Sequence, residues 1–190
     1  MSEPRADRVY LRQGFLAPTD LLRVLAAIDR LSPSWTSSEQ LGLLGRGRTT
    51  QVRSSDLAAQ APLDEIRHFL APATLQWAKS CGFWFAGPPR LQLFPVRMIG
   101  DKTAPPSQEP HVDTYGGPSD VPVCTNVFYA KADGLDGGEL MLAPMPDGPT
   151  VDPIAIRPTP NTIATIAGDR VHWVAPLYAG ERISIVINLY

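Results

Sequence analysis

The second half of the sequence contains a series of short β-type segments with no helical pattern between them. These segments are RLQLFPVRMIG (90–100), TNVFYAK (125–131), GELML (138–142), DPIAIRP (152–158), NTIATIAG (161–168) and RISIVINLY (182–190). They are rich in β-branched and aromatic residues, and Gly, Pro and Asp turns separate them. Short strands that follow one another without intervening helices favour an antiparallel sandwich or jelly roll over a doubly wound parallel sheet.

Helical patterns are confined to the first half. In APTDLLRVLAAIDRL (17–31), apolar residues recur with a period of 3.6, and Thr19 and Asp20 are candidate caps after Pro18. A second helical region is expected over residues 62–82, with a break or kink at Pro72. We expect these helices to pack on one outer face of the β-sheet.

The chain length and composition predict one domain over residues 1–190. With 190 residues and 44% hydrophobic content, the chain can bury one sizeable core. We divide it into a helical N-terminal support region (1–89) and a β core (90–190).

The charge balance argues against polyanionic partners. A net charge of -2 and a pI near 5.9 give no overall attraction to nucleic acid or to an anionic membrane. Arg46, Arg48 and Arg53 lie in GLLGRGRTTQVRSS (42–55), which lacks interleaved aromatic residues. This segment is therefore expected to be a solvated or substrate-facing loop, and no nucleic-acid partner is expected.

The N-terminus, MSEPRADRVYL, lacks the apolar run of a signal peptide, and no window has the length and hydropathy of a membrane span. We expect a cytoplasmic protein with no membrane partner. Cys81 and Cys124 form no CxxC pair and are expected to be buried free thiols.

The three histidines provide the first chemical signal. His68 lies within a helical pattern and is expected to be structural. His111 and Asp113 in EPHVDTYGG are separated by one residue, so an extended backbone places both side chains on the same side. His172, in AGDRVHWV, can supply a third ligand from another strand. Two imidazoles and a carboxylate form the facial triad typical of Fe(II) sites that keep coordination positions open.

The last segment, RISIVINLY, alternates strictly between two kinds of side chain. Ile183, Ile185, Ile187 and Leu189 fall on one face, and Arg182, Ser184, Val186 and Asn188 fall on the other. The second face either points to solvent or lines a polar interior. In an interior, a guanidinium and a hydroxyl two residues apart could bind one carboxylate of a dicarboxylate cosubstrate.

In combination, His111-x-Asp113, then His172, then Arg182-x-Ser184 resembles the Fe(II)- and 2-oxoglutarate-dependent oxygenase superfamily. GGEL (137–140) and the stretch 167–190 are similar to its prolyl-hydroxylase-like branch, as is the opening strand and helix pattern of residues 10–31. The resemblance implies a double-stranded β-helix, which is a jelly roll with a cupin-like barrel. It also implies that His111, Asp113 and His172 are catalytic iron ligands.

The same resemblance implies that Arg182, assisted by Ser184, binds 2-oxoglutarate, and that O2 is the other cosubstrate. Many members of the branch have a tyrosine on the strand before HxD, whereas this sequence offers Gln92 and Arg97 there. Further candidate cosubstrate contacts are Gln92, Asn126 and Tyr129. Candidate substrate contacts are Arg97, Tyr115 and Trp173.

The activity implied is oxidation, most simply hydroxylation, of a C–H bond with release of succinate and CO2. A small molecule such as an amino acid or a natural-product intermediate is the expected substrate, and arginines near the site would suit a carboxylate on it. Two alternatives remain open: a peptidyl-prolyl hydroxylase of the same superfamily, and a non-oxygenase cupin-like isomerase or sensor. The protein is expected to be a monomer or a homodimer.

Overall fold

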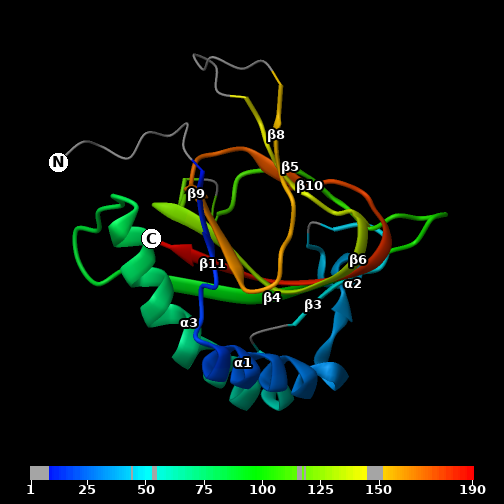
Figure 1. The fold of residues 1–190 in the computed structure, drawn as a ribbon, viewed down its shortest axis with the longest axis horizontal. Coiled ribbons are helices and arrows are strands. Elements are labelled where there is room, and N and C mark those ends of the chain that lie inside the picture. Colours follow the sequence, from blue (N-terminus) through cyan, green and yellow to red (C-terminus); the bar gives the residue numbers. More distant parts are fainter. Residues whose placement is uncertain (1–8, 44, 53–54, 115–116, 118, 145–151) are drawn as a thin grey trace.

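The fold was obtained as a computed structural model, which describes residues 9–43, 45–52, 55–114, 117, 119–144 and 152–190. Figure 1 shows its elements. In chain order these are β1 (Tyr10–Gln13), α1 (Pro18–Arg30), η1 (Ser32–Ser34), β2 (Thr36–Ser37), α2 (Ser38–Leu41), β3 (Thr49–Gln51), η2 (Leu57–Ala59), α3 (Gln60–Ser80), β4 (Leu91–Ile99), β5 (Gln108–His111), β6 (Cys124–Gly137), β7 (Leu140–Leu142), β8 (Ile154–Ile156), β9 (Thr162–Ala167), β10 (His172–Val174) and β11 (Leu177–Leu189).

The strands form two sheets in which the paired strands are antiparallel. The larger sheet has seven strands in the order β1-β9-β6-β11-β4-β3-β2, and the smaller has four in the order β5-β10-β7-β8. The chain crosses between the sheets several times from β4 onward, as Figure 1 shows. This arrangement is the double-stranded β-helix, and every β segment expected from the sequence contains one of its strands.

Strand β11 forms the centre of the larger sheet and confirms the alternation expected from its sequence. Its isoleucines and Leu189 are buried in an apolar core together with residues of α1 and α3. Its intervening residues Arg182, Ser184 and Val186 line a cavity on the opposite face. One strand therefore separates the supporting core from the interior of the barrel.

The helices pack against the outer face of the larger sheet. Val24, Ala27 and Ile28 of α1 and Leu63 and Ile66 of α3 belong to the same core cluster as the outward-facing residues of β11. In Figure 1 both helices lie on the side of β4 and β11 away from β5, β8 and β10. A second cluster, which includes Val127, Leu140 and Ile166, fills the space between the two sheets.

Two details of the predicted helices are wrong. Helix α1 begins at Pro18, with Ala17 as its N-cap, so Thr19 and Asp20 lie within the first turn and do not cap it. The fixed φ of proline suits the first helical position, where the missing N–H has no intrahelical partner. Helix α3 continues from Gln60 to Ser80 through Pro72 without a break.

The segment 42–55 is also more regular than the expected loop, because it contains β3, which pairs with β4. Arg46 and Arg48 lie before this strand, and Arg53 lies outside the described residues. Cys81 and Cys124 are buried free thiols, as predicted. Within the described residues, no helix combines the length and the hydropathy that crossing a membrane requires.

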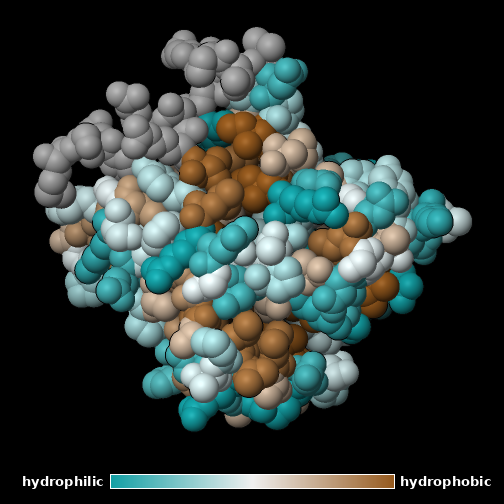
Figure 2. All heavy atoms as spheres, in the orientation of Figure 1, coloured by the Kyte–Doolittle hydropathy of each residue, from teal (hydrophilic) through white to brown (hydrophobic). Residues whose placement is uncertain are grey.

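The surface is not uniformly polar. Figure 2 shows apolar side chains gathered over the lower part of the molecule, where α1 lies in Figure 1, between areas of polar residues. Leu22 of α1 contributes to the exposed apolar surface, with 66% of its area accessible. Leu22 therefore faces solvent, whereas Val24, Ala27 and Ile28 of the same helix are buried.

Candidate metal centre and adjoining cavity

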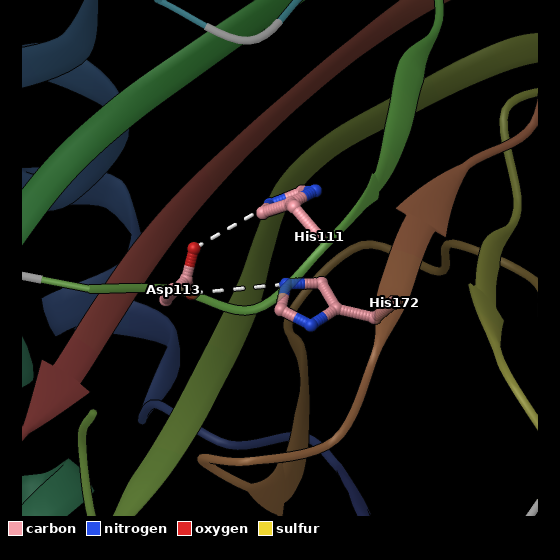
Figure 3. Close-up of side chains that lie close together, drawn as sticks. All are labelled: His111, Asp113 and His172. Atoms are coloured by element: carbon pink, nitrogen blue, oxygen red, sulfur yellow. Dashed lines mark ion pairs between the residues drawn. The ribbon is translucent and has the colours of Figure 1, made fainter. Parts of the chain in front are cut away.

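Antiparallel pairing brings two distant histidines together. His111 is the last residue of β5 and His172 is the first residue of β10, and these two residues are directly paired between the strands. Their ring centroids are 4.5 Å apart. The next turn of the chain places Asp113 beside them, and Figure 3 shows the three side chains pointing toward one another.

The three side chains form a compact set of candidate metal ligands. The Nε2 atom of His111 lies 3.5 Å from one carboxylate oxygen of Asp113, and the Nε2 atom of His172 lies 3.7 Å from the other. One ligand atom from each residue lies within 4.8 Å of the other two. Among the described residues, this is the group of histidine, cysteine and acidic side chains that could hold a metal ion.

The hydrogen bonds of the imidazoles determine which ring nitrogens are available. Nδ1 of His111 lies 2.7 Å from the carbonyl oxygen of Glu109, and Nδ1 of His172 lies 2.9 Å from that of Arg170. A carbonyl oxygen can only accept, so each Nδ1 donates its proton. Each neutral ring then presents an Nε2 lone pair, as histidine ligands do when a backbone carbonyl orients them.

The carboxylate of Asp113 is held between these rings. Thr125 of β6 donates a hydrogen bond to Asp113 at 3.1 Å. Burial alone would raise the pKa of Asp113, but the two histidines and the Thr125 hydroxyl lower it below its ordinary value. Two nitrogen lone pairs and a carboxylate in close proximity repel one another unless a cation or a proton lies between them. The arrangement is therefore suited to a cation.

Arg182 occupies the far end of an adjoining cavity. This inner cavity, of about 30 Å³, is lined by the triad and by Arg182 and Ser184. The Arg182 side chain is only 3% exposed, and its guanidinium carbon lies 5.3 Å from the centre of the Tyr129 ring. Burial lowers the pKa of Arg182, and the nearby Tyr129 and Glu139 oppose this only in part.

Arg182 and Tyr129 each have a buried polar atom without a hydrogen-bond partner in the described part of the chain. Among the described residues, neither Nε of Arg182 nor the hydroxyl of Tyr129 has a hydrogen-bond partner. Buried polar groups are nearly always paired, so the orphaned Nε of Arg182, which lines the inner cavity, indicates a place for a ligand that accepts hydrogen bonds. Burial also raises the pKa of Tyr129 to about 12, so its hydroxyl keeps its proton and can donate.

Comparisons with known proteins agree with this architecture. No protein-family model and no curated protein matches the sequence. Solved structures do match. An α-ketoglutarate-dependent non-heme epimerase, SnoN, from nogalamycin biosynthesis has a TM-score of 0.73 at 18% identity over 98% of this chain and 78% of that one.

Two hydroxylases are also similar. A prolyl hydroxylase from Trichoplax adhaerens, solved with a peptide fragment of hypoxia inducible factor, has a TM-score of 0.68 at 15% identity and covers 97% of this chain and 84% of that one. A prolyl-4-hydroxylase from Pseudomonas putida has a TM-score of 0.64 at 19% identity, and the match covers 95% of this chain and 91% of that one. The chain has the 2OG-Fe(II) oxygenase fold.

A larger space opens on the other side of the triad in this oxygenase fold. This outer groove has a volume of about 590 Å³ and is lined by residues of α2, β3, α3, β4 and the segment around His111 and Asp113. It shares Phe94, Gln108, His111 and Asp113 with the inner cavity. Gln92 lines the outer groove and accepts a hydrogen bond from the Tyr190 hydroxyl, so it lies on the groove side of the triad, away from Arg182.

Asn126 is not where the sequence suggested. Its side chain faces the helices, where Nδ2 donates to the Ile187 carbonyl at 2.9 Å and Oδ1 accepts from Thr165 at 2.7 Å. Thr165 in turn accepts from the indole nitrogen of Trp77 in α3. The amide of Asn126 thus satisfies the interface between sheet and helix, and we remove it from the candidate cosubstrate contacts.

The suggested substrate contacts also fall elsewhere. Arg97 lies on the outer face of β4, where its Nε donates to Glu181 at 2.7 Å. Trp173 follows His172 in β10 and therefore points to the opposite side of that strand. Neither side chain lines the cavity or the groove. Tyr115 lies outside the described residues.

Sequence reasoning missed several residues around the site. Thr125 supports Asp113, and Leu63 and Arg67 of α3 line the outer groove. The sequence pattern of α3 predicts a helix that supports the sheet, and nothing in it indicates that two of its residues line a groove. Only the packing of α3 beside β4 shows it.

Proposed function

We propose that the protein is an Fe(II)- and 2-oxoglutarate-dependent dioxygenase that oxidises, most simply by hydroxylation, a C–H bond of a small molecule. One observation carries the proposal. A His-Asp-His triad and a buried arginine with an unsatisfied donor line the same inner cavity. The first is a ligand set for Fe(II), and the second is an anchor for an anionic cosubstrate.

The residues present fit an iron ion. Nε2 of His111, Nε2 of His172 and a carboxylate oxygen of Asp113 would be its ligands, and both rings are fixed by backbone carbonyls on their other nitrogen. Two imidazoles and one carboxylate leave coordination positions open, which suits iron that must also bind cosubstrates. A structural zinc site would instead close its coordination shell with a fourth protein ligand.

The residues present also fit 2-oxoglutarate. Arg182, with Ser184 and the Tyr129 hydroxyl nearby, would bind the carboxylate that points away from the metal. A guanidinium and a phenol can both donate to a carboxylate. The inner cavity as it stands has space for about one water molecule, so we expect the Arg182 side chain to move away from Tyr129 when the cosubstrate enters.

When bound, iron and 2-oxoglutarate would supply the oxidising power by activating O2, with release of succinate and CO2. The chain itself would position the cosubstrate and the substrate and would exclude water from the site. The triad and Arg182 hold the cosubstrate from opposite ends, and the sheets exclude water from the space between them. The outer groove holds the substrate, with the bond to be oxidised next to His111 and Asp113.

Several observations support a small molecule as the substrate. The outer groove is of the size that holds drug-sized ligands, and it opens directly at the triad. The structural neighbours differ on this point, because one was solved with a peptide and another acts in nogalamycin biosynthesis. Similarity in fold therefore does not determine the substrate class, and the proposal of a small molecule rests on the outer groove.

Succinate formation tests the proposed reaction. The full chain is incubated in air with Fe(II), ascorbate and 2-oxoglutarate, without and with a panel of small carboxylates and natural-product intermediates, and succinate is measured by mass spectrometry. We expect slow succinate release without substrate and faster release with a matching one. His111→Ala should abolish both, because it removes a metal ligand.

Arg97→Gln is the matched control, since Arg97 lies on the neighbouring strand but pairs with Glu181 outside the cavity. It should retain succinate release. If the iron-loaded protein produced no more succinate than His111→Ala, the oxygenase proposal would be wrong. Binding of a divalent ion without any response to 2-oxoglutarate would favour the cupin-like isomerase or sensor instead.

A further inference from the structure

The outer groove has two chemically different parts. Its inner end, at the triad, is polar and includes Gln92 and Asn188 on neighbouring strands. Its outer end is enclosed by apolar side chains, among them Leu43, Val52 and Leu63. Val52 and Leu63 are almost fully buried, whereas Leu43 is 48% exposed at the rim. Leu43 therefore offers the largest accessible apolar surface of these three residues, and a ligand that fills this end of the groove would bury an apolar part against it.

One turn of α3 joins the apolar end to a positive charge. Leu63 and Arg67 are four residues apart, so they lie on the same face of the helix, and both line the groove. Arg67 forms an ion pair with Asp64 one turn earlier, and both side chains are largely exposed. Exposed pairs of this kind contribute little, so Arg67 can exchange Asp64 for an anionic group of a ligand at low cost.

The other charged side chains that line the described part of the groove are Arg90 and Asp113. Arg90 also lines it, and its guanidinium binds both carboxylate oxygens of Asp120, at 2.7 and 2.6 Å. Among the described lining residues, Asp113 is the single acidic side chain, and it belongs to the triad. Arg46 and Arg97 are directed elsewhere, toward Glu109 and Glu181. A cation would therefore meet repulsion in this groove, and an anion would meet Arg67.

We propose that the substrate is a small molecule with an apolar part and an anionic group, such as a carboxylate, and that Arg67 of α3 selects for this charge. The apolar body lies against Leu43, Val52 and Leu63, and the anion lies at the outer rim, away from the triad. The inference rests on the proposed function only in calling the ligand a substrate. The binding preference itself follows from the groove.

A matched set of probes measures the preference. Naphthalene-1-carboxylate, 1-naphthamide and 1-naphthylmethylammonium share one apolar body and differ in charge. Their affinities for the full Zn(II)-loaded chain are determined by ligand-detected proton NMR. We expect the carboxylate to bind tightest and the ammonium weakest.

Two substitutions on one helical turn should move the affinity in opposite directions. Arg67→Gln should weaken carboxylate binding about 2- to 5-fold, as expected for loss of an exposed charge pair, and should leave the amide unchanged. Asp64→Asn should tighten carboxylate binding, because it releases Arg67 without touching the groove lining. A merely structural role of the pair would make both variants change in the same direction.

The apolar end is tested separately. Leu43→Ser should weaken all three probes, whereas Leu22→Ser, an exposed leucine of α1 outside the groove, should weaken none. Replacing Zn(II) by Mn(II) then tests proximity to the triad. We expect the paramagnetic ion to broaden the signals of the bound probe, and the effect should disappear in His172→Ala.

Two results would overturn the inference: equal or tighter binding of the ammonium probe, or a carboxylate preference that survives Arg67→Gln. Broadening of the probe signals that survived His172→Ala would refute the placement of the groove beside the triad. Failure of the proposed function would look different, because a chain that bound the carboxylate through Arg67 but released no succinate would keep the groove and lose only the oxygenase activity.

Discussion

Replacement of Arg182 by methionine should separate cosubstrate binding from folding. Methionine has a flexible apolar side chain that can fill the same space beside Met98 and Tyr129 without a charge. Arg182 is 3% exposed, and its Nε has no hydrogen-bond partner among the described residues. The guanidinium therefore costs free energy in the unliganded protein, and in the proposed function its Nε would gain a partner when 2-oxoglutarate binds.

The expected magnitudes follow from this burial. Removing one partner of a buried, hydrogen-bonded charge pair costs about 2 to 5 kcal/mol of binding free energy, which weakens binding about 30- to 4,000-fold. In the unliganded protein, the desolvation penalty of a buried charge is several kcal/mol, and the contact with the Tyr129 ring offsets up to about 2 kcal/mol. Arg182→Met should thus leave the free energy of unfolding unchanged or raise it by about 1 to 3 kcal/mol.

Two measurements on the same protein samples test both parts. Anaerobic calorimetry of the Fe(II)-loaded protein gives the affinity for 2-oxoglutarate, and urea unfolding without metal or cosubstrate gives the stability. Arg97→Met is the control, since it removes an arginine whose partner is Glu181 on the outer face, and cosubstrate affinity should stay unchanged. Wild-type affinity in Arg182→Met would refute the anchor, and a loss of several kcal/mol in stability would refute the argument that the charge is costly.

Three further substitutions address other parts of the structure. His172→Ala should abolish binding of Fe(II) measured by calorimetry, whereas His68→Ala should not, since His68 lies on α3; retained affinity in the first would remove it from the ligand set. Burial would raise the pKa of Glu181, but its ion pairs lower it below the ordinary 4.5. Its stabilising effect is therefore present above pH 4.5 and is lost as the pH falls below that value. Glu181→Gln should accordingly be about 1 kcal/mol less stable than wild type at pH 7, with the difference in urea unfolding shrinking progressively as the pH falls below 4.5; a difference that did not depend on pH would contradict the ion-pair explanation. Asn126→Leu should lower stability by about 1 to 3 kcal/mol because the Ile187 carbonyl loses the Asn126 amide donor and the Thr165 hydroxyl loses its acceptor, yet 2-oxoglutarate affinity should not change.

The sequence predicted those parts of the fold in which local pattern and burial agree. In β11, strict alternation identified both faces correctly because one face packs on the helices and the other lines the cavity. The period of 3.6 likewise located α1. The break at Pro72 was not correct, because tertiary packing along α3 outweighs the loss of one backbone hydrogen bond.

The site could be predicted only where spacing along the chain corresponds to proximity in space. His111 and Asp113 are close in sequence, and His172 was found because the chain has only two other histidines. Asn126 was assigned wrongly because a polar residue in a strand can face either the cavity or the helix interface, and its partners Thr165 and Trp77 come from distant segments. Arg67 could not be found at all, because its role depends on where α3 lies beside β4.

The most direct test of the proposed function is an anaerobic titration of 2-oxoglutarate into the Fe(II)-loaded protein, monitored by visible absorption. We predict a weak charge-transfer band that grows with 2-oxoglutarate, saturates at one equivalent per chain, and is absent when His111→Ala is titrated. Iron that binds to the triad but gives no band at any concentration of 2-oxoglutarate would contradict the dioxygenase proposal.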